Sequence, residues 1–207
     1  MTLNGFDAIA PFYDLLVKLV FGRAHMKSQK TFLNEVPETS TILILGGGTG
    51  DILVELLLVK PHCKIYYVEA SEKMISLTKM KIKNQNSICF IHGTQENIPD
   101  QIFDVVITNF YLDLFTHNTL LSVIRNINKS LPIDSQWFIT DFADGGKFWQ
   151  RVLLKIMYRF FQVLCKIETD HLPVWKDALQ QSGFKRKKTV FFFHGFIESE
   201  RYVKIGQ

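Results

Sequence analysis

Short apolar runs alternate along the chain with longer segments whose apolar residues recur at helical spacing, and this pattern predicts strands and helices in turn. The predicted strands cover Thr41–Leu45, Lys64–Glu69, Ile88–His92, Phe103–Asn109 and Gln136–Phe142. The predicted helices between them cover Asp51–Val59, Glu72–Ile82 and Asn118–Leu131. Strands and helices that alternate in this way form a parallel sheet with right-handed crossovers, so the pattern predicts an α/β fold.

The pattern changes after the fifth strand. A long amphipathic helix is predicted over about Lys147–Ile167, and a second helix over Pro173–Ser182 with Gly183 as the residue that ends it. The last segment predicts two strands joined through His194 and Gly195. The second part of the chain therefore departs from simple alternation of strand and helix.

The length and composition fit one well-buried domain. The chain has 207 residues, of which 47% are hydrophobic and 21% are charged, which is enough for one core and short for two. No internal repeat and no low-complexity linker divides the sequence. We therefore predict a single domain over residues 1–207, with residues 1–40 as an N-terminal helical cap and residues 145–170 as a helical insertion.

Charge and cysteine content argue against several classes of protein. The net charge of +4 and the pI near 8.9 come from dispersed cations, so we expect no nucleic-acid partner. Cys63, Cys89 and Cys165 are far apart and lack metal-ligand spacing, which predicts reduced thiols and no metal site. The sequence shows neither a secretion signal nor an apolar run of about 18 residues, so we expect a cytoplasmic protein without stable membrane insertion.

The candidate ligand site begins where the first strand ends. The sequence there reads TILILGGGTGDILVELL: a buried strand, a glycine-rich turn and the start of a helix. Such a turn presents backbone N–H groups and a helix N-terminus to a ligand. No frame fits the dinucleotide pattern G-x-G-x-x-G, but Gly46, Gly48 and Gly50 fit G-x-G-x-G. Gly47 lies inside this loop and Asp51 follows it; taken alone, the loop is also compatible with an ordinary tight turn.

The second strand ends in an acid. This strand end and the start of the next helix read V-E-A-S-E-K-M-I, with Glu69 as the last strand residue and Ser71 as the predicted helix N-cap. A carboxylate in this place can accept hydrogen bonds from two ribose hydroxyls, which indicates a nucleoside ligand. The alternative is that Glu69 is a solvated carboxylate at a strand end.

Together, the two motifs resemble those of class I S-adenosylmethionine (SAM)-dependent methyltransferases. The loop G-x-G-x-G followed by an acid is similar to motif I of that family, and V-E-A-S-E-K-M-I is similar to its pattern V-[DE]-x-S-x-x-M-[LI]. The resemblance implies a Rossmann-like seven-stranded sheet, mostly parallel, that closes with a C-terminal antiparallel hairpin. It also implies that the loop holds the methionine and ribose part of SAM, that Glu69 binds the ribose and that Ala70 packs on the adenine.

Two positions depart from the family pattern. The stretch FIHGTQENIPDQIFDVV resembles F-x-x-G-D-A-E-x-L-P, but Thr94 replaces the acid that accepts from the adenine amino group. Gln95 could partly substitute through its side-chain carbonyl. Ile44 replaces a second acid, which helps to hold the methionine ammonium. Because a charged hydrogen bond is worth about 1.5–3 kcal/mol, these losses predict weak SAM binding unless other groups compensate. Groups that could compensate are Asp14, Asp51 and the carbonyl of Asn109.

The N-terminal segment NGFDAIAPFYDLLVKLVFG resembles the leading helix of the ubiquinone/menaquinone-biosynthesis methyltransferases and the related methyltransferase type 11 group, through its F-D-x-I-A-x-x-Y-D core. In that group the helix folds over the cofactor, so the resemblance places Tyr13 and Asp14 within reach of SAM. Several apolar residues are predicted to share one face of this helix. They are Phe6, Ile9, Ala10, Tyr13, Leu16, Val17 and Val20.

Two acids are the candidate catalytic groups. Methyl transfer needs a general base only where the acceptor must lose a proton. Asp113 follows the fourth predicted strand and Asp141 lies at the end of the fifth, so both lie where a parallel sheet binds its ligands. Either could serve as the base or as a partner for a substrate donor. His117 and His194 are further polar candidates, and each could instead belong to a helix start or a turn.

The predicted helix over Trp149–Ile167 carries two stripes at helical spacing. The apolar stripe consists of Trp149, Val152, Leu153, Ile156, Met157, Phe160 and Leu164, and the cationic stripe consists of Arg151, Lys155, Arg159 and Lys166. In the family that the chain resembles, an insertion here stands over the acceptor. The helix could be a lid over an apolar acceptor, a membrane-surface face, a dimer contact or plain core. A lid should face a cavity bounded by Tyr13, Tyr111 or Asp113.

Three functions are compatible with these motifs to different degrees. The first is a cytoplasmic SAM-dependent methyltransferase that releases S-adenosylhomocysteine (SAH) and methylates a small, apolar or aromatic acceptor. The second is a homologue that binds SAM or SAH with little or no catalysis and acts through binding or assembly. A nicotinamide oxidoreductase is disfavoured by the glycine spacing and by the absence of a Tyr-x-x-x-Lys pair. We expect a monomer or a homodimer.

Overall fold

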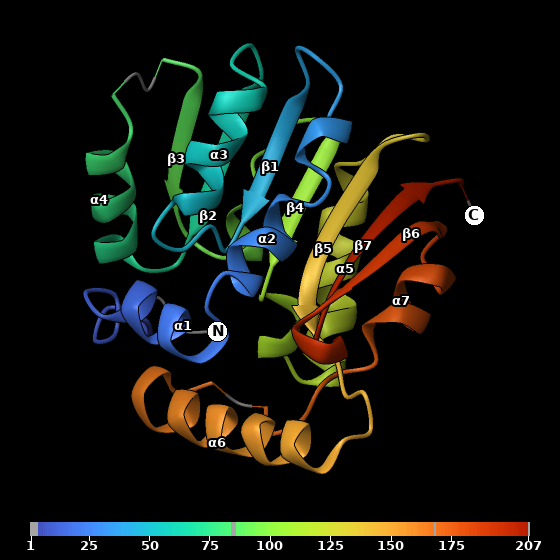
Figure 1. The fold of residues 1–207 in the computed structure, drawn as a ribbon. Helices are drawn as coiled ribbons and strands as arrows, with labels where there is room; N and C mark the ends of the chain where they lie inside the picture. The colour runs from blue at the N-terminus through green and yellow to red at the C-terminus, as the bar shows by residue number, and fades with distance from the viewer. Residues whose placement is uncertain (1–3, 84–85, 168, 207) are drawn as a thin grey trace.

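The computed structural model describes residues 4–83, 86–167 and 169–206, which form a sheet covered by helices (Figure 1). The strands are β1 (Thr41–Leu45), β2 (Lys64–Glu69), β3 (Ile88–His92), β4 (Val105–Asn109), β5 (Gln136–Phe142), β6 (Phe184–Phe192) and β7 (Ile197–Lys204). Their order across the seven-stranded sheet is β3-β2-β1-β4-β5-β7-β6. Strands β1 to β5 are parallel, and β7 runs antiparallel to both β5 and β6. The predicted α/β fold with a C-terminal antiparallel hairpin is confirmed.

Helices cover both faces of the sheet. They are α1 (Tyr13–Phe21), α2 (Ala24–Lys30), α3 (Asp51–Val59), α4 (Glu72–Lys81), α5 (His117–Lys129), α6 (Phe148–Cys165) and α7 (Trp175–Gln181). Side chains alternate along β1: Ile42 and Ile44 pack in the core with α3, whereas Leu43 and Leu45 pack in the core with α5 and α7. Because both faces of this strand are buried, its sequence is an unbroken apolar run.

The predicted elements agree with the structure to within two residues, except at the N-terminus. There the predicted leading helix is wrong in part, because residues 4–12 form turns and α1 begins only after them. Pro11 gives the reason: it disfavours helical backbone in the preceding Ala10 and has no N–H to donate. The predicted single apolar face is therefore broken. Ala10 is buried, whereas Leu16 and Val20 are 36% and 41% exposed.

A third core joins the N-terminal turns to α6 and to the loop between β6 and β7. Its buried residues include Phe6, Phe21, Leu154 and Phe196. Figure 1 shows α1 and α6 beyond the ends of the strands toward which the parallel arrows point. The carboxyl ends of parallel strands are where α/β sheets bind their ligands. The N-terminal turns, α1 and α6 therefore lie over the edge of the sheet that carries the candidate site.

The most buried residues of helix α6 lie mainly beside the apolar stripe of the sequence. Its buried residues are Gln150, Leu154, Tyr158 and Cys165. Ile156, in the middle of the predicted stripe, is 61% exposed. The Tyr158 hydroxyl donates to the carbonyl of Asp113 at 3.4 Å, and the Gln150 amide donates to the carbonyl of His194 at 3.2 Å. Two polar side chains with internal partners thus set the orientation of the helix, which apolar spacing alone does not capture.

Among the described helices, none combines the length and the apolar composition that a membrane span needs. The described residues also contain no group of three or more His, Cys, Asp or Glu that could hold a metal ion. The cysteines are free thiols: Cys63 and Cys165 are buried and Cys89 is exposed.

Candidate cofactor and acceptor sites

The glycine loop links the end of β1 to the start of α3. Gly46 has a φ of +69°, and a Cβ there would lie 2.4 Å from the ring of Tyr111, so backbone and packing both require glycine. Gly47 and Gly50 also lie close to side chains beneath the loop. Gly48 has a φ of +63°, but its Cβ would meet nothing within 4 Å. The loop therefore packs against the protein at Gly46 and presents an open face at Gly48.

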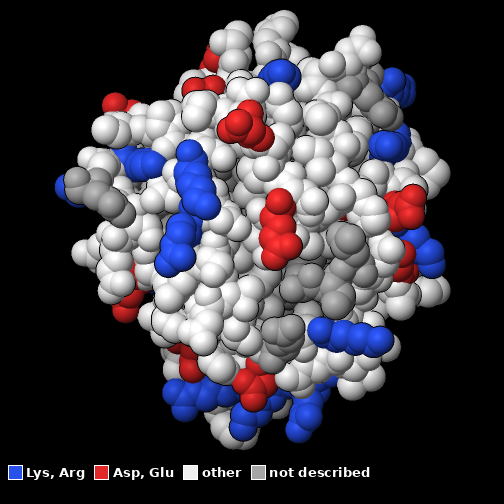
Figure 2. All heavy atoms as spheres, turned by 180° about the vertical axis from the view of Figure 1, so that it is seen from behind, with Lys and Arg blue, Asp and Glu red and all other residues white. Residues whose placement is uncertain are grey.

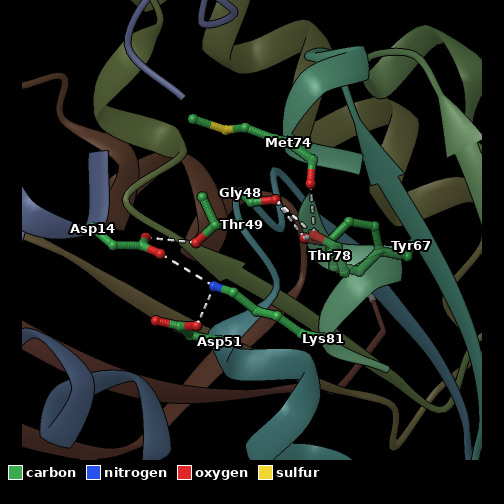
Figure 3. A network of polar contacts seen from close by, with 8 residues as sticks. All are labelled: Asp14, Gly48, Thr49, Asp51, Tyr67, Met74, Thr78 and Lys81. Atoms are coloured by element: carbon green, nitrogen blue, oxygen red, sulfur yellow. Dashed lines mark hydrogen bonds and ion pairs between the residues drawn. The ribbon is translucent and has the colours of Figure 1, made fainter. Parts of the chain in front are cut away.

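Three side chains hold Gly48 from below. The hydroxyls of Tyr67 and Thr78 donate to its carbonyl at 2.8 and 3.1 Å (Figure 3). Glu69 accepts from the Gly48 N–H at 2.9 Å and from the Ser71 N–H at 2.8 Å. Glu69 is only 4% exposed, and this burial raises the pKa of its carboxyl group. Glu69 thus stabilises the loop in this structure, and its contact with a ribose remains a prediction.

A cavity of about 1080 Å³, which we call the glycine-loop cavity, opens on this loop and extends along α1, α2 and α3. The predicted cofactor residues that line it are Gly46, Gly47, Gly48, Asp51, Asn109 and Tyr13, together with Asp14 and Ile44. The amide Nδ2 of Asn109 is buried and has no hydrogen-bond partner among the described residues. Because a buried donor normally has an acceptor, this amide fits a ligand that brings one, such as the carboxylate of SAM.

Asp14 fastens α1 to the glycine loop (Figure 3). Its Oδ1 accepts from the hydroxyl of Thr49 at 2.6 Å, and its Oδ2 pairs with Lys81 at 3.1 Å. Lys81 also pairs with Asp51, at 2.6 Å. The two carboxylates that could compensate for Ile44 thus flank one ammonium group. A cation therefore fits between Asp14 and Asp51 at the edge of the glycine-loop cavity.

The predicted adenine side of the site is covered by the N-terminal turns. The Asn4 N–H donates to the carbonyl of Ala70 at 2.8 Å, and Ala70 is 1% exposed. The hydroxyl of Thr94 caps the short 3-10 helix that follows it. The side-chain carbonyl of Gln95 accepts from the hydroxyl of Tyr111 at 3.1 Å, so it is already engaged. None of these predicted adenine residues lines the glycine-loop cavity, and a ligand at Ala70 would have to displace Asn4.

A second cavity, of about 200 Å³, lies between α6 and α1, and we call it the α6 cavity. The walls from α6 are Leu153, Ile156, Met157, Phe160 and Phe161. The polar side chains in its lining are Tyr13, His25 and Asp113. Tyr13 and Asp113 therefore occupy the positions that a lid over an acceptor requires, whereas Tyr111 packs on the glycine loop instead. An apolar cavity of about 150 Å³ accepts benzene, so the α6 cavity has room for a ring.

The two cavities meet at Tyr13, Val17, His25 and Phe110, which line both of them. Phe110 follows β4 with a φ of +50°, a strained conformation for a bulky residue. Its ring stacks on the imidazole of His25, with centroids 4.4 Å apart. Burial lowers the pKa of His25 to about 4, so its imidazole is neutral at pH near 7. The side-chain nitrogen Nε2 of Gln29 lies 2.9 Å from Nδ1 of this imidazole.

Neither His25 nor Phe110 was predicted from the sequence. His25 is a lone histidine on a short helix, and no sequence pattern places α2 beside the end of β4. The one local signal is the aromatic residue directly after the strand-end Asn109, where a parallel sheet binds ligands.

Asp113 and Asp141 form a buried carboxyl pair beside the α6 cavity. Asp141 accepts from the backbone N–H groups of Leu112 and Asp113 at 3.1 and 3.2 Å, and from that of Phe142 at 2.9 Å. Oδ1 of Asp113 is buried without a hydrogen-bond partner in the described chain. Burial raises the pKa of both groups, and their mutual repulsion raises that of Asp141 further. The pair therefore holds a proton more readily than exposed carboxyls do, and Asp113 faces the cavity.

The two histidine candidates lie elsewhere. His117 is exposed and is the first residue of α5. His194 is exposed in the turn between β6 and β7, where its carbonyl accepts from Lys147 and Gln150. Neither residue lines the glycine-loop cavity or the α6 cavity.

Residues 42–132 match the family described as a methyltransferase domain. This segment contains the glycine loop, Glu69 and Asp113. The chain is therefore similar to methyltransferases over this segment. Over most of its length it is similar to a demethylmenaquinone methyltransferase of Geobacillus stearothermophilus, with 25% identity over 94% of this chain and 88% of the relative. It is also similar to a malonyl-[acyl-carrier protein] O-methyltransferase of Priestia megaterium, with 28% identity over 68% of this chain and 50% of that one.

Solved structures share the fold of this chain at low sequence identity. A chain from the complex that contains the Haloferax volcanii Trm112 methyltransferase activator has a TM-score of 0.75 and 14% identity, over 100% of this chain and 99% of that chain. The N-methyltransferase NodS of Bradyrhizobium japonicum WM9, bound to SAH, has a TM-score of 0.68 and 14% identity, over 89% of this chain and 88% of that one. The Rossmann-like class I fold is thereby confirmed, and the methyltransferases that share it include one bound to SAH.

Proposed function

We propose that this chain is a methyltransferase and that it transfers the methyl group of SAM to a small, apolar or aromatic acceptor that binds in the α6 cavity. The observation that carries this proposal is the meeting of two cavities, one bounded by the glycine loop and one by apolar side chains. When bound, SAM supplies an electrophilic methyl group. The side chains common to both cavities, Tyr13, Val17, His25 and Phe110, are where an acceptor would approach that group.

The chain offers groups that could hold SAM without the two missing acids. Asn109 Nδ2 provides a donor for the carboxylate of SAM. Asp14 and Asp51 could hold its ammonium in the place that Lys81 now takes between them. Each carboxylate oxygen of Glu69 accepts one backbone hydrogen bond and has a second lone pair for a ribose hydroxyl.

The lining of the α6 cavity favours a ring without charge. Apolar burial contributes roughly 25 cal/mol per Å², whereas a charged group would lose its hydration with few polar partners. The relative from Geobacillus stearothermophilus is named a demethylmenaquinone methyltransferase, and that name supports a quinone-type ring as the acceptor here.

Asp113 is the group that we assign as proton acceptor. Its unpartnered Oδ1 and its place in the cavity lining bring it near an acceptor ring. The raised pKa makes it a stronger base than an exposed carboxylate. Asp141 positions it by accepting from its backbone N–H, and the neutral imidazole of His25 can orient the acceptor through one hydrogen bond.

A cavity-filling variant tests the assignment of the acceptor site. Met157→Trp should lower transfer from radiolabelled SAM to naphthol and quinol acceptors at least roughly tenfold, while the affinity for SAH stays unchanged in calorimetry. Met80→Trp, on the exposed side of α4, is the control and should change neither quantity. Equal loss of SAH affinity in Met157→Trp would contradict separate sites. Tight SAH binding without transfer to any ring acceptor would favour the binding-only homologue.

A further inference from the structure

Large apolar side chains stay exposed on α1 and α6. On α1, Leu15 and Leu19 are 67% and 81% exposed, and on α6 the exposed fractions of Phe148, Ile156 and Val163 are 83%, 61% and 76%. Figure 1 places the two helices at the same end of the molecule, and both contribute walls to the α6 cavity. We call these five residues the apolar face. Scattered exposed apolar residues are ordinary, but a set of them on two neighbouring helices marks an interaction surface.

The apolar face adjoins the mouth of the α6 cavity. Leu16 and Val20 follow Leu15 and Leu19 by one position, about 100° around the helix. Both line the cavity, yet they are 36% and 41% exposed. Ile156 likewise lines the cavity while belonging to the apolar face. The cavity therefore opens toward this face.

A row of cations borders the apolar face on α6. Arg151, Lys155 and Arg159 recur at four-residue spacing, and the sequence of α6 contains no Asp or Glu. Figure 2 shows Lys and Arg side chains gathered along the lower edge of the molecule, where Figure 1 places α6. Arg151 pairs with Asp144 at 3.3 Å, near the start of the helix. An apolar strip beside a cationic strip is typical of a helix that lies in the interface of an anionic bilayer.

We propose that the apolar face and the cationic row bind the surface of an anionic phospholipid bilayer, with the mouth of the α6 cavity turned toward the lipid. A bilayer complements both parts, because acyl chains accept the apolar side chains and headgroups accept the cations. A symmetric contact between two copies of the chain would bring two cationic rows into one interface. Charge complementarity therefore favours the bilayer over a second copy.

One consequence rests on the proposed function. The α6 cavity, of about 200 Å³, has room for a ring but not for a long chain. An acceptor with an apolar tail would keep that tail in the bilayer while its ring enters through the mouth. The acceptor class that fits is therefore a lipid-borne aromatic or quinol ring, taken from the membrane rather than from solution.

Co-sedimentation with vesicles tests the surface directly. The probes are vesicles of phosphatidylcholine alone and vesicles with roughly one third phosphatidylglycerol. The unmodified protein should bind the anionic vesicles, and Leu19→Glu combined with Phe148→Glu should lower that partitioning at least about tenfold. Lys155→Glu combined with Arg159→Glu should lower binding to the anionic vesicles only. The control pair, Leu58→Glu with Met80→Glu, replaces residues that are 74% and 75% exposed on α3 and α4, and should bind like the unmodified protein.

Two further measurements distinguish loss of lipid binding from unfolding and from loss of a dimer. Melting temperatures check the fold of each variant, and light scattering gives its mass. Absence of vesicle binding by the unmodified protein, or equal loss in the control pair, would overturn the proposal. So would a change from dimer to monomer in the Leu19 and Phe148 variant without any vesicle binding, because the face would then join two copies. Failure of the unmodified protein to bind SAH would contradict the proposed function and leave the vesicle result untouched.

Discussion

The glycine-loop cavity and the α6 cavity are built in different ways. Around the glycine loop, groups from consecutive strands are held by hydrogen bonds: Gly48 donates its N–H to Glu69 and accepts from the hydroxyl of Tyr67. The α6 cavity joins segments far apart in the chain by apolar contacts, such as the rings of Phe6 and Phe161, whose centroids lie 6.0 Å apart. Changes at the loop should therefore alter folding and cofactor binding together, whereas changes at the α6 cavity should alter transfer and spare cofactor binding.

The glycines of the loop give the largest expected effect. Gly46→Ala combines backbone strain with a clash against Tyr111, so it should lower the free energy of unfolding by about 3 kcal/mol and abolish SAH binding. Gly48→Ala has the backbone strain without a clash, so it should lower the free energy of unfolding by about 1 kcal/mol. Urea denaturation and calorimetry check both values. Equal losses in the two variants would mean that packing on Tyr111 does not matter.

Asp113→Asn should give the next largest effect, on transfer alone. Loss of the proton acceptor should lower the rate of methyl transfer about 100-fold for an acceptor that must lose a proton, while the SAH affinity stays within about twofold. Glu72→Gln, on the exposed surface of α4, is a control that should change neither value. Full transfer activity in Asp113→Asn would show that Asp113 is not the proton acceptor.

The same variant should also change how stability depends on pH. A carboxyl group whose pKa is raised by folding stabilises the protein below its unfolded pKa of about 4, and this contribution is lost as the pH rises through the folded pKa. Asp113→Asn removes one member of the pair. Its melting temperature should therefore exceed that of the unmodified protein near pH 8 and match it near pH 4. A constant difference across this range would show that the pair is not the cause.

A change at Glu69 should lower both the stability of the protein and its affinity for SAH. Glu69→Ala leaves the N–H groups of Gly48 and Ser71 without their acceptor, so it should cost about 1–3 kcal/mol of stability. It should also raise the dissociation constant of SAH at least about tenfold, if Glu69 binds the ribose. Glu69→Gln keeps one acceptor oxygen and should lose less stability. Unchanged SAH affinity in Glu69→Ala would show that the ribose assignment is wrong.

The smallest expected effect is at Thr94. Thr94→Asp restores an acceptor for the adenine amino group and should tighten SAM binding about threefold, with little change in stability because aspartate caps as well as threonine. Thr94→Ser keeps the cap without the carboxylate and should bind SAM like the unmodified protein. Equal affinity in Thr94→Asp would mean that the adenine is held in another way.

The sheet was predictable because each of its signals is local. Strands buried on both faces give unbroken apolar runs. The turn after β1 needs glycine at Gly46 because of the positive φ there and the contact with Tyr111. The same holds for Ser71, whose side chain caps α4 as predicted. These features do not depend on how distant segments pack.

The cap over the sheet was less predictable because its signals are not local. Periodicity continued the leading helix through Pro11, where the backbone cannot follow it. On α6 it placed part of the apolar stripe, such as Met157 and Phe160, on the side of the cavity. It did not predict that Gln150 and Tyr158 are buried, because these residues bond to other parts of the chain. His25 and Phe110 meet only because α2 packs beside the end of β4, which no spacing in the sequence encodes.

The ion pairs that fasten α1 also set how the N-terminal segment opens. The side chains of Lys81, Asp14 and Asp51 are 32%, 48% and 46% exposed, and pairs in such settings are worth about 0–1 kcal/mol. Phe21 is the buried residue of α1, so this helix can open locally while the sheet stays folded, and its amide protons should exchange with deuterium well before those of β1. Added salt should speed that exchange in α1 alone. If the adenine of SAH packs on Ala70, which Asn4 covers, the lifetime of this closed segment would limit how fast SAH leaves the protein.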